Sequence, residues 1–331
     1  MSIKLWRSTP VDVPILNGTK SNEKYSQAVI TSARQGLTEA VNHLGLERTD
    51  YVGIPDYASH CVIDFIGRRA TPVPIRMLKQ ESPSAILIYD QWGWQKSEKA
   101  RSDINLMYPG IQLIWDRVDS LPRSYQTLAE SDENQADVQV FSLKKTLTAT
   151  GGGLVWLQGE RWLRRESSND RELVQLLEQV TEKFAKGHKI DNKLQTFIFR
   201  ECDYHLRLQE WLDSCAIDSV SAYEHRERRD RIDHFVNKFS VEELPQWMRD
   251  QIENDASPAP GIWPIHSVDV DDNLLAKMRD KFDVDVRNYH FNFNDSYIDQ
   301  QWTEVLAVPL HSEIQMETLE ELIDCVIHSS S

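Results

Sequence analysis

The 331-residue sequence predicts an α/β fold in which a mostly parallel central sheet, covered by helices, precedes a small C-terminal α+β domain. Two observations predict it. Runs with strand and helix character alternate between residues 51 and 118, which is typical of parallel strands joined by crossover helices. The proline-containing segment Ser257–Gly261 reads as a linker, and a second group of strands and helices follows it. We therefore expect a large domain over residues 1–240 and a small domain over residues 241–331.

The elements of the large domain can be assigned in chain order. Residues 1–22 are polar and are predicted to form an irregular arm, and residues 24–45 are predicted to form one helix that ends at Gly45. Short apolar runs bounded by turn residues suit strands that are buried on both faces. Such runs predict strands over residues 51–57, 73–75, 85–89, 111–116 and 138–141, with helices over residues 58–68 and 97–108.

Helical patterns replace the strands between residue 169 and about residue 250. Within this part, residues 225–231 are dense in charged side chains, which predicts a solvated helix face with ion pairs. After the linker, the small domain is predicted to contain strands over residues 262–268, 286–293 and 305–310 and helices over residues 273–282 and 316–327.

The composition excludes several classes of protein. With 37 basic and 52 acidic residues the formal net charge is −15, so a non-specific nucleic-acid binder is not expected. No apolar run approaches the ~20 residues of a membrane span, and the first residues lack the apolar core of a signal peptide. The scattered Cys61, Cys202, Cys215 and Cys325 predict reduced thiols and no metal site. We expect a cytoplasmic protein that does not bind membranes.

The segment that follows the strand over residues 138–141 contains Ser142, Lys144, Lys145 and the glycines Gly151–Gly153. A lysine at the end of a buried strand, beside hydroxyls and tight backbone, is where a Schiff-base lysine is expected, because partial desolvation makes the amine nucleophilic at neutral pH. Glycines let the backbone approach a bound group closely. The alternative interpretation is a solvated hairpin corner.

Asp116 ends the predicted strand over residues 111–116, which comes before the strand over residues 138–141. It lies about 30 residues before the lysines. In open α/β sheets, ligands bind beyond the carboxyl ends of strands. A carboxylate and a lysine at two such ends match the needs of pyridoxal phosphate (PLP), whose aldehyde reacts with a lysine and whose pyridine nitrogen is kept protonated by an acid. Alternatively, Asp116 is a helix cap or part of a surface turn.

Five segments carry a family resemblance through their order along the chain: Thr31–Leu37, Ile54–Cys61, Trp115–Asp116, Phe141–Leu147 with Gly152–Gly153, and Val308–His311. They resemble motifs of the DegT/StrS type of fold-type-I aminotransferases, PLP-dependent enzymes that act mainly on sugar nucleotides. These motifs are the Ser-Gly-Arg/Thr-x-Ala-Leu helix start, a Pro-x-Tyr-Thr-x segment, a Glu-Asp pair, Ser-Phe-x-Lys-x-Leu…Gly-Gly and Leu-Pro-Leu-His. The resemblance covers residues 28–158 well and residues 259–327 more loosely.

The resemblance implies a fold-type-I PLP-dependent transferase-like fold with two catalytic residues. Lys145 would be the Schiff-base lysine, because the family places it three residues after the serine. Strand alternation would then turn Lys144 to the opposite face of the sheet. Asp116 would bind the pyridine nitrogen. The lysine, once released, would also act as the base that moves a proton from the substrate's α-carbon.

The remaining cofactor contacts are implied in the same way. Ser142 and the amides of Ser32, Ala33 and Arg34 would bind the phosphate, because a helix N-terminus presents free N–H groups. Ser32 can serve as an ordinary N-cap at the same time. Ala33 stands where the family usually has glycine.

Two further positions at the expected cofactor site depart from the family pattern. Ser59 stands where an aromatic ring usually covers the pyridine, so His60 or Tyr57 is the expected replacement. Asp119 stands three residues after Asp116, where the family usually has His or Gln. The Asn motif that the family's partner chain contributes is not evident between residues 195 and 230.

The expected function is PLP-dependent transfer of an amino group from an amino acid donor to a carbonyl acceptor, for example a keto sugar carried on a nucleotide. The resemblance also implies a homodimer with active sites near the subunit interface. Two alternatives stay open. One is a PLP enzyme with other chemistry, such as a dehydratase, although the family's sugar dehydratases have histidine in place of the lysine. The other is a non-catalytic member that keeps the fold as a binding or dimer scaffold.

Overall fold

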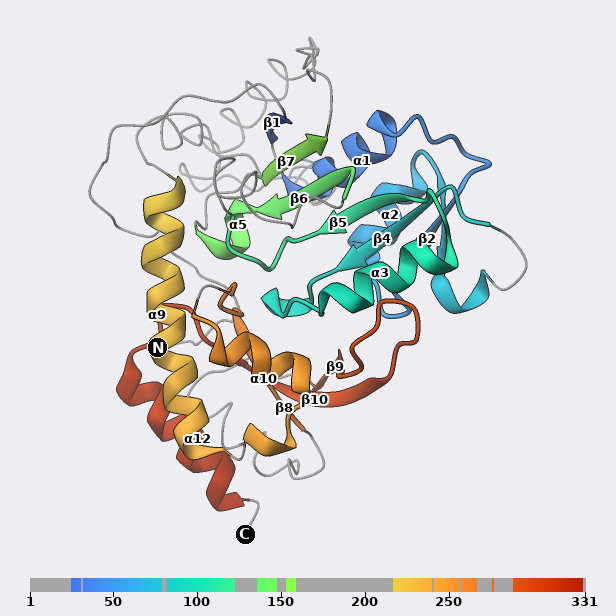
Figure 1. The fold of residues 1–331 in the computed structure, drawn as a ribbon. Helices are drawn as coiled ribbons and strands as arrows, with labels where there is room; N and C mark the ends of the chain where they lie inside the picture. The colour runs from blue at the N-terminus through green and yellow to red at the C-terminus, as the bar shows by residue number, and fades with distance from the viewer. Residues whose placement is uncertain are drawn as a thin grey trace, which may run out of the picture.

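The computed structural model describes residues 25–30, 32–78, 82–122, 136–147, 153–158, 217–239, 241–255, 257–266, 276 and 288–329. These residues form a seven-stranded sheet, a three-stranded sheet and the helices that pack against them (Figure 1).

The seven-stranded sheet has the strand order β1-β7-β6-β5-β4-β2-β3. The pairs from β6 to β3 are parallel, and β7 is antiparallel to both β6 and β1. The expected mostly parallel sheet is therefore confirmed, and its five parallel strands all end at one edge, where ligands of open α/β sheets bind. The strands are β1 Tyr25–Ile30, β2 Tyr51–Ile54, β3 Thr71–Pro74, β4 Ala85–Tyr89, β5 Gln112–Asp116, β6 Val138–Ser142 and β7 Gly153–Gln158.

Helices cover both faces of this sheet. Helices α1 (Ala33–His43) and α2 (His60–Gly67) pack on one face, and α3 (Glu98–Met107) packs on the other. Strand β5 shows the alternation, because Ile114 joins the core under α1 and α2 whereas Leu113 and Trp115 join the core under α3. Burial on both faces explains why these strands appear in the sequence as continuous apolar runs.

The prediction of a single helix over residues 24–45 is wrong in its first part. Residues 25–30 form β1, which pairs Tyr25 with Gln158 and Ile30 with Gly153 on β7. Helix α1 begins only after Ser32, whose side chain accepts a hydrogen bond from the Gln35 backbone N–H at 3.2 Å. The strand forms because β7 would otherwise leave one edge unpaired, and pairing with a distant partner overrides local helical preference.

The C-terminal part contains an antiparallel sheet of order β8-β10-β9, with β8 Ile262–His266, β9 Asn288–Asn292 and β10 Trp302–Pro309. Helices α9 (Ile217–Lys238), α10 (Gln246–Glu253) and α12 (Met316–Ser329) contribute to its core. The strands and the last helix confirm the expected α+β end. The helical stripes expected over residues 169–216 lie outside the described residues, as does the helix expected over residues 273–282 except for residue 276.

Three of the four arginines in residues 225–231 are buried and only Arg226 is exposed, so the prediction of a solvated helix face is wrong for those three. Arg228 and Arg231 do form the expected ion pairs within α9, with Glu224 and Glu227 respectively. Arg229, however, is only 8% exposed and donates to the backbone carbonyls of residues 251, 252, 254 and 257 at 2.7 to 3.1 Å. These carbonyls replace water as acceptors, and the sequence pattern of α9 alone does not reveal them.

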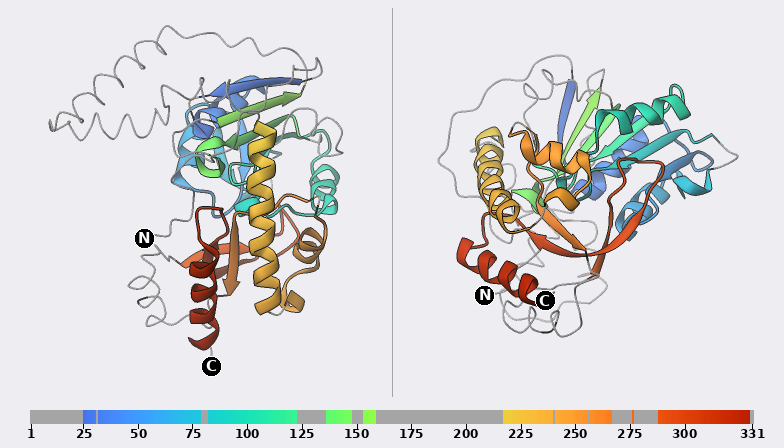
Figure 2. Two further views of the ribbon diagram at one scale, coloured as in Figure 1. Left: turned by 90° about the vertical axis from the view of Figure 1, so that its left-hand side faces the viewer. Right: turned by 60° about the horizontal axis from the view of Figure 1, so that its bottom comes forward.

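Helix α9 and the segment Ser257–Gly261 connect the two sheets. Figure 2 shows α9 running alongside both sheets. The Gly261 N–H donates to the carbonyl of Trp92 at 2.7 Å, and the Gly261 carbonyl accepts from the Leu310 N–H at 2.8 Å. The expected linker is thus a packed connection whose Ala259 is fully buried. No helix among the described residues is long and apolar enough to cross a membrane.

Candidate active site

The polar edge of the large sheet is formed by the last residues of three adjacent strands. Tyr89 ends β4, Asp116 ends β5 and Ser142 ends β6. Strand alternation places all three on the face that α1 and α2 cover, together with Leu87, Ile114 and Val140. Asp116 is 2% exposed and Ser142 is 6% exposed, so this edge is a buried polar site.

Lys145 reaches this edge from a short helical turn. It lies in α5 (Leu143–Thr146), and the Ser142 side chain accepts a hydrogen bond from its backbone N–H at 3.3 Å. The Lys145 Nζ atom lies 2.8 Å from Oδ1 of the fully buried Asp119. Because both lysines lie in this turn, strand alternation does not separate Lys144 from Lys145, contrary to expectation. Within the described structure, it is the ion pair with Asp119 that places Lys145 at the polar edge.

Tyr89 completes this group and is a residue that the sequence analysis missed. Its phenol donates a short hydrogen bond to Oδ2 of Asp119, whose other carboxylate oxygen accepts from Lys145. Burial and the Asp119 carboxylate raise the pKa of Tyr89 well above its ordinary value. The only signal in the sequence is that a tyrosine ends an otherwise aliphatic strand, which is equally typical of a core position.

The environment shifts the protonation of both predicted catalytic residues. Burial raises the pKa of Asp116 to about 7, although the Lys145 cation and a hydrogen bond from the Val118 N–H at 3.2 Å lower it. Burial lowers the pKa of Lys145, but the neighbouring acidic groups, above all the Asp119 carboxylate and then Asp116, together outweigh this effect and leave the pKa above its ordinary value. The two side chains are therefore close enough to interact electrostatically, as expected for groups that act on one ligand.

The N-terminus of α1 lies against this edge because of one glycine. A Cβ atom at Gly153 would stand 2.7 Å from the Ala33 nitrogen and 2.8 Å from the Phe141 carbonyl oxygen. Only glycine permits this approach of α1 to β6 and β7. The close approach at Gly153 is that of the α1 backbone, and the expected approach of backbone to a bound group stays a prediction. Ser32 is buried at this helix start, and Arg34 is half-buried.

The residues at the start of α2 are less enclosed. Ser59 and His60 are exposed, and the Ser59 hydroxyl lies 2.9 Å from the Cys61 sulfur. The Tyr57 ring stacks on His290 of β9, with the ring centroids 4.5 Å apart.

Replacing Gly153 with alanine is expected to destabilise the protein by several kcal/mol, because the new methyl group would overlap backbone atoms that cannot rotate away. Gly67→Ala is the matched control, since its added Cβ atom would meet nothing closer than Pro72 at 3.9 Å. Urea denaturation of both variants measures the difference. Equal stabilities for the two variants would contradict the close packing of α1 on β7.

The arrangement fits a cofactor with a phosphate, a pyridine nitrogen and an aldehyde. The helix N-terminus at Ala33 offers backbone N–H groups to an anion, buried Asp116 offers a carboxyl group to a ring nitrogen, and Lys145 offers an amine. Asp119, one of the positions that differ from the family pattern, adds a second carboxylate beside the lysine.

Comparisons with known proteins agree with this fold. Residues 17–330 match the model of a family described as "Putative PLP-dependent aminotransferase". No curated protein sequence matches the chain. Solved structures that share the fold include NtdA of Bacillus subtilis with bound cofactor PMP, at 13% identity and a TM-score of 0.55 over 93% of this chain and 74% of that one.

Two further structures show the same likeness. One is a DegT/DnrJ/EryC1/StrS aminotransferase of Brucella abortus, at 14% identity and a TM-score of 0.51 over 91% of this chain and 85% of that one. The other, from Streptococcus pneumoniae, is described as a "Putative sugar aminotransferase" and shares 13% identity and a TM-score of 0.52 over 92% of this chain and 87% of that one. The described fold is thus that of fold-type-I PLP enzymes, and by the match over residues 17–330 the chain belongs to the PLP-dependent aminotransferase family.

Proposed function

We propose that Lys145 and Asp116 carry the chemistry of a PLP-dependent aminotransferase in this protein. The observation that supports this most is their placement at the carboxyl ends of adjacent parallel strands, where the Lys145 charge acts on the buried Asp116 carboxyl group. Lys145 binds the cofactor covalently through its amine. Asp116 binds the pyridine nitrogen and keeps it protonated, for which its burial beyond the reach of water is well suited.

The other contacts follow from the neighbouring elements. The amides of Ser32, Ala33 and Arg34, together with the Ser142 hydroxyl, bind the phosphate at the start of α1. The Tyr57 ring is already stacked on His290, so His60, beside Ser59 at the start of α2, is the better candidate to cover the pyridine ring. Asp119 holds the Lys145 ammonium in place before the cofactor binds.

PLP, when bound, supplies an electron sink and a carbon that exchanges its oxygen for an amino group. This chain's residues then have two tasks. The Lys145 amine, once released from the cofactor, accepts the proton from the α-carbon of the amino donor. Asp119 and Tyr89 orient that amine and set the pH at which it is free to react.

Asp119→Asn is expected to lower the pKa of Lys145, because the largest favourable interaction of the ammonium is lost while its burial remains. The free amine would then be present at lower pH, and the rate of acetylation of Lys145 by acetic anhydride would rise about tenfold at a fixed pH near 8 for each unit by which the pKa falls. Mass spectrometry of labelled apoprotein measures this rate. Asp103→Asn, at a partly exposed position of α3, is the control. An unchanged pH profile for Lys145 labelling would contradict the role of Asp119.

The proposed substrates are an amino acid donor, such as glutamate, and a carbonyl acceptor. The structural likeness to the "Putative sugar aminotransferase" of Streptococcus pneumoniae supports a keto sugar as one class of acceptor. We also propose a cytoplasmic homodimer, as in the family that the motifs resemble. Sedimentation at micromolar concentration that shows only a species of about 38 kDa would exclude the dimer.

The function is tested by a half-reaction screen on the protein loaded with PLP. Single amino acids are added, and the loss of the visible absorption of the lysine-bound cofactor is recorded. Keto acids and keto sugars are then added, and recovery of that absorption identifies the acceptor. If no donor changes the spectrum of a protein that carries the cofactor, amino transfer is refuted, and other PLP chemistry or a binding scaffold takes its place.

A further inference from the structure

The Asp119 carboxylate is held in place by donors from three different segments of the chain. The side chain is fully buried. Its Oδ1 atom lies 2.8 Å from the Lys145 Nζ atom, and its Oδ2 atom accepts a short hydrogen bond from the Tyr89 phenol. Oδ2 also accepts from the Trp92 backbone N–H at 3.1 Å. Among the residues that the structure describes, Lys145 is the only cation paired with Asp119.

The backbone around Trp92 is unusual at the point where it contacts Asp119. Trp92 has a φ angle of 60°, in the left-handed region that residues other than glycine rarely adopt. Gly93 follows with a φ angle of 86°, and a Cβ atom there would stand 3.2 Å from the Asp119 carbonyl oxygen. Backbone strain of this kind is concentrated at functional sites. The loop after β4 is therefore folded closely against Asp119.

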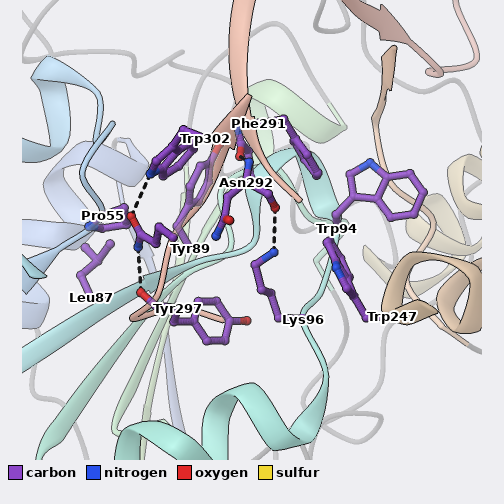
Figure 3. Close-up of a pocket in the computed structure, with 12 residues that line it drawn as sticks. Pro55, Leu87, Tyr89, Trp94, Lys96, Trp247, Phe291, Asn292, Tyr297 and Trp302 are labelled. Atoms are coloured by element: carbon purple, nitrogen blue, oxygen red, sulfur yellow. Dashed lines mark hydrogen bonds between the residues drawn. The ribbon is translucent and has the colours of Figure 1, made fainter. Parts of the chain in front are cut away.

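Tyr89 serves Asp119 as a neutral donor. The Tyr89 side chain lines a small pocket between β4 and the small sheet, together with Phe291 and Trp302 (Figure 3). Its phenol oxygen, however, is engaged with Asp119. Burial and the Asp119 carboxylate raise the pKa of Tyr89 well above its ordinary value, so the phenol keeps its proton at neutral pH. The hydrogen bond therefore stabilises the carboxylate without neutralising its charge.

The buried charge of Asp119 needs a cation beside it when the cofactor is bound as well as before. Asp116 is the other carboxyl group that acts on Lys145, and in the proposed function it binds the pyridine nitrogen. Asp119 is then the carboxylate that remains for the lysine. A carboxylate removed from water is strongly destabilised when it loses its cation. The Lys145 nitrogen is therefore favoured in a charged form both before and after it bonds to PLP.

We propose that Asp119 is the counter-ion of the covalent link between Lys145 and PLP and keeps the nitrogen of that link protonated. This rests on the proposed function and adds a catalytic residue to it. When the lysine ammonium bonds to the aldehyde carbon, two of its three protons leave with the aldehyde oxygen as water. The third proton stays on the nitrogen with the positive charge, so the step releases no proton. The charged nitrogen draws electrons from the carbon of the link and makes it more reactive towards the amine of the donor.

The test is a pH titration of the visible absorption of the PLP-loaded protein, because the link absorbs at longer wavelength when its nitrogen is protonated. Asp119→Asn keeps the shape of the side chain and removes its charge, so the pKa of the link should fall by about one unit or more, a tenfold change in proton affinity. Tyr89→Phe removes one hydrogen bond from Oδ2 and leaves the carboxylate charged, so the pKa of the link should not fall.

The other titratable groups that act on Lys145 are Asp116 and Cys61. Asp116 is present in each variant, so its effect on the link is common to all of them. Cys61→Ser, which removes the thiol, is the matched control and should titrate as the unmodified protein does. The unmodified protein adds a second measurement, since its link should stay protonated through neutral pH.

Three results would overturn the proposal. They are a link in the unmodified protein that loses its proton below about pH 7, a pKa of the link that does not fall in Asp119→Asn, and equal falls in Asp119→Asn and Tyr89→Phe. An unmodified protein that shows no visible absorption with PLP would refute the proposed function itself, so the two failures are distinguishable.

Discussion

Lys145→Ala is expected to abolish covalent capture of PLP and to lower the rate of amino transfer by at least 10²- to 10⁴-fold, the contribution of a general base alone. The reason is that Lys145 is the amine that the described structure places at the end of β6 beside Asp119 and Asp116. Absorption spectra of the reconstituted protein and reduction with borohydride, followed by peptide mapping, measure the loss of the covalent link.

Lys144→Ala is the matched control, because Lys144 is the adjacent lysine in the same helical turn. It is expected to keep the visible absorption and the trapped label. If borohydride fixes the cofactor to Lys144, or to any other lysine of the unmodified protein, the assignment of Lys145 is wrong.

Asp116→Asn should have two opposite effects, of which the first is on catalysis. Asparagine cannot hold the pyridine nitrogen in its protonated form, and loss of such an electrostatic partner typically lowers kcat by about 10²- to 10³-fold. The visible link to Lys145 should remain, since the lysine is unchanged. Steady-state rates with a donor and acceptor from the half-reaction screen measure this effect.

The second effect is on the stability of the apoprotein. The pKa of Asp116 rises from 3.8 to about 7 on folding, so the folded state holds its proton more tightly than the unfolded state does. Stability is therefore lost as the pH rises from about 4 to about 7, by up to about 4 kcal/mol in total. Asp116→Asn removes this loss and should be more stable than the parent at pH 8 but not at pH 4. Urea denaturation at both pH values measures these stabilities. A variant that is less stable than the parent protein at pH 8 would contradict the cost of burying the ionised Asp116 carboxylate.

Local patterns in the sequence were sufficient for the parallel part of the fold. The strands that end in Tyr89 and Asp116 are buried on both faces, so their apolar runs are unambiguous. The segment that contains Lys145 was found for a similar reason, because a serine, two lysines and glycines directly follow a buried strand. Its helical turn was not predicted, since the capping of α5 by Ser142 depends on where β6 ends.

The parts that were not predicted depend on partners far away in the sequence. Strand β1 needs β7, with Tyr25 opposite Gln158. Arg229 is buried because four carbonyl groups beyond residue 250 surround it. Tyr89 is part of the site because Asp119 turns back towards it. None of these contacts leaves a periodic pattern, so propensity and hydropathy cannot reveal them.

The loop after β4 has a consequence for how the molecule moves. Trp92 and Trp94 extend from the large sheet into the core of the small sheet. There the Trp92 ring stacks on Phe291, and the indole N–H of Trp94 donates to the Ile262 carbonyl at 2.9 Å. A hinge between the two units would have to withdraw both indole rings from that core, at several kcal/mol each. We therefore expect no domain closure during turnover, in contrast to enzymes whose domains close over their substrates. Access to the site would be governed by local loop motions, and the arrangement of the two sheets would stay rigid throughout the catalytic cycle.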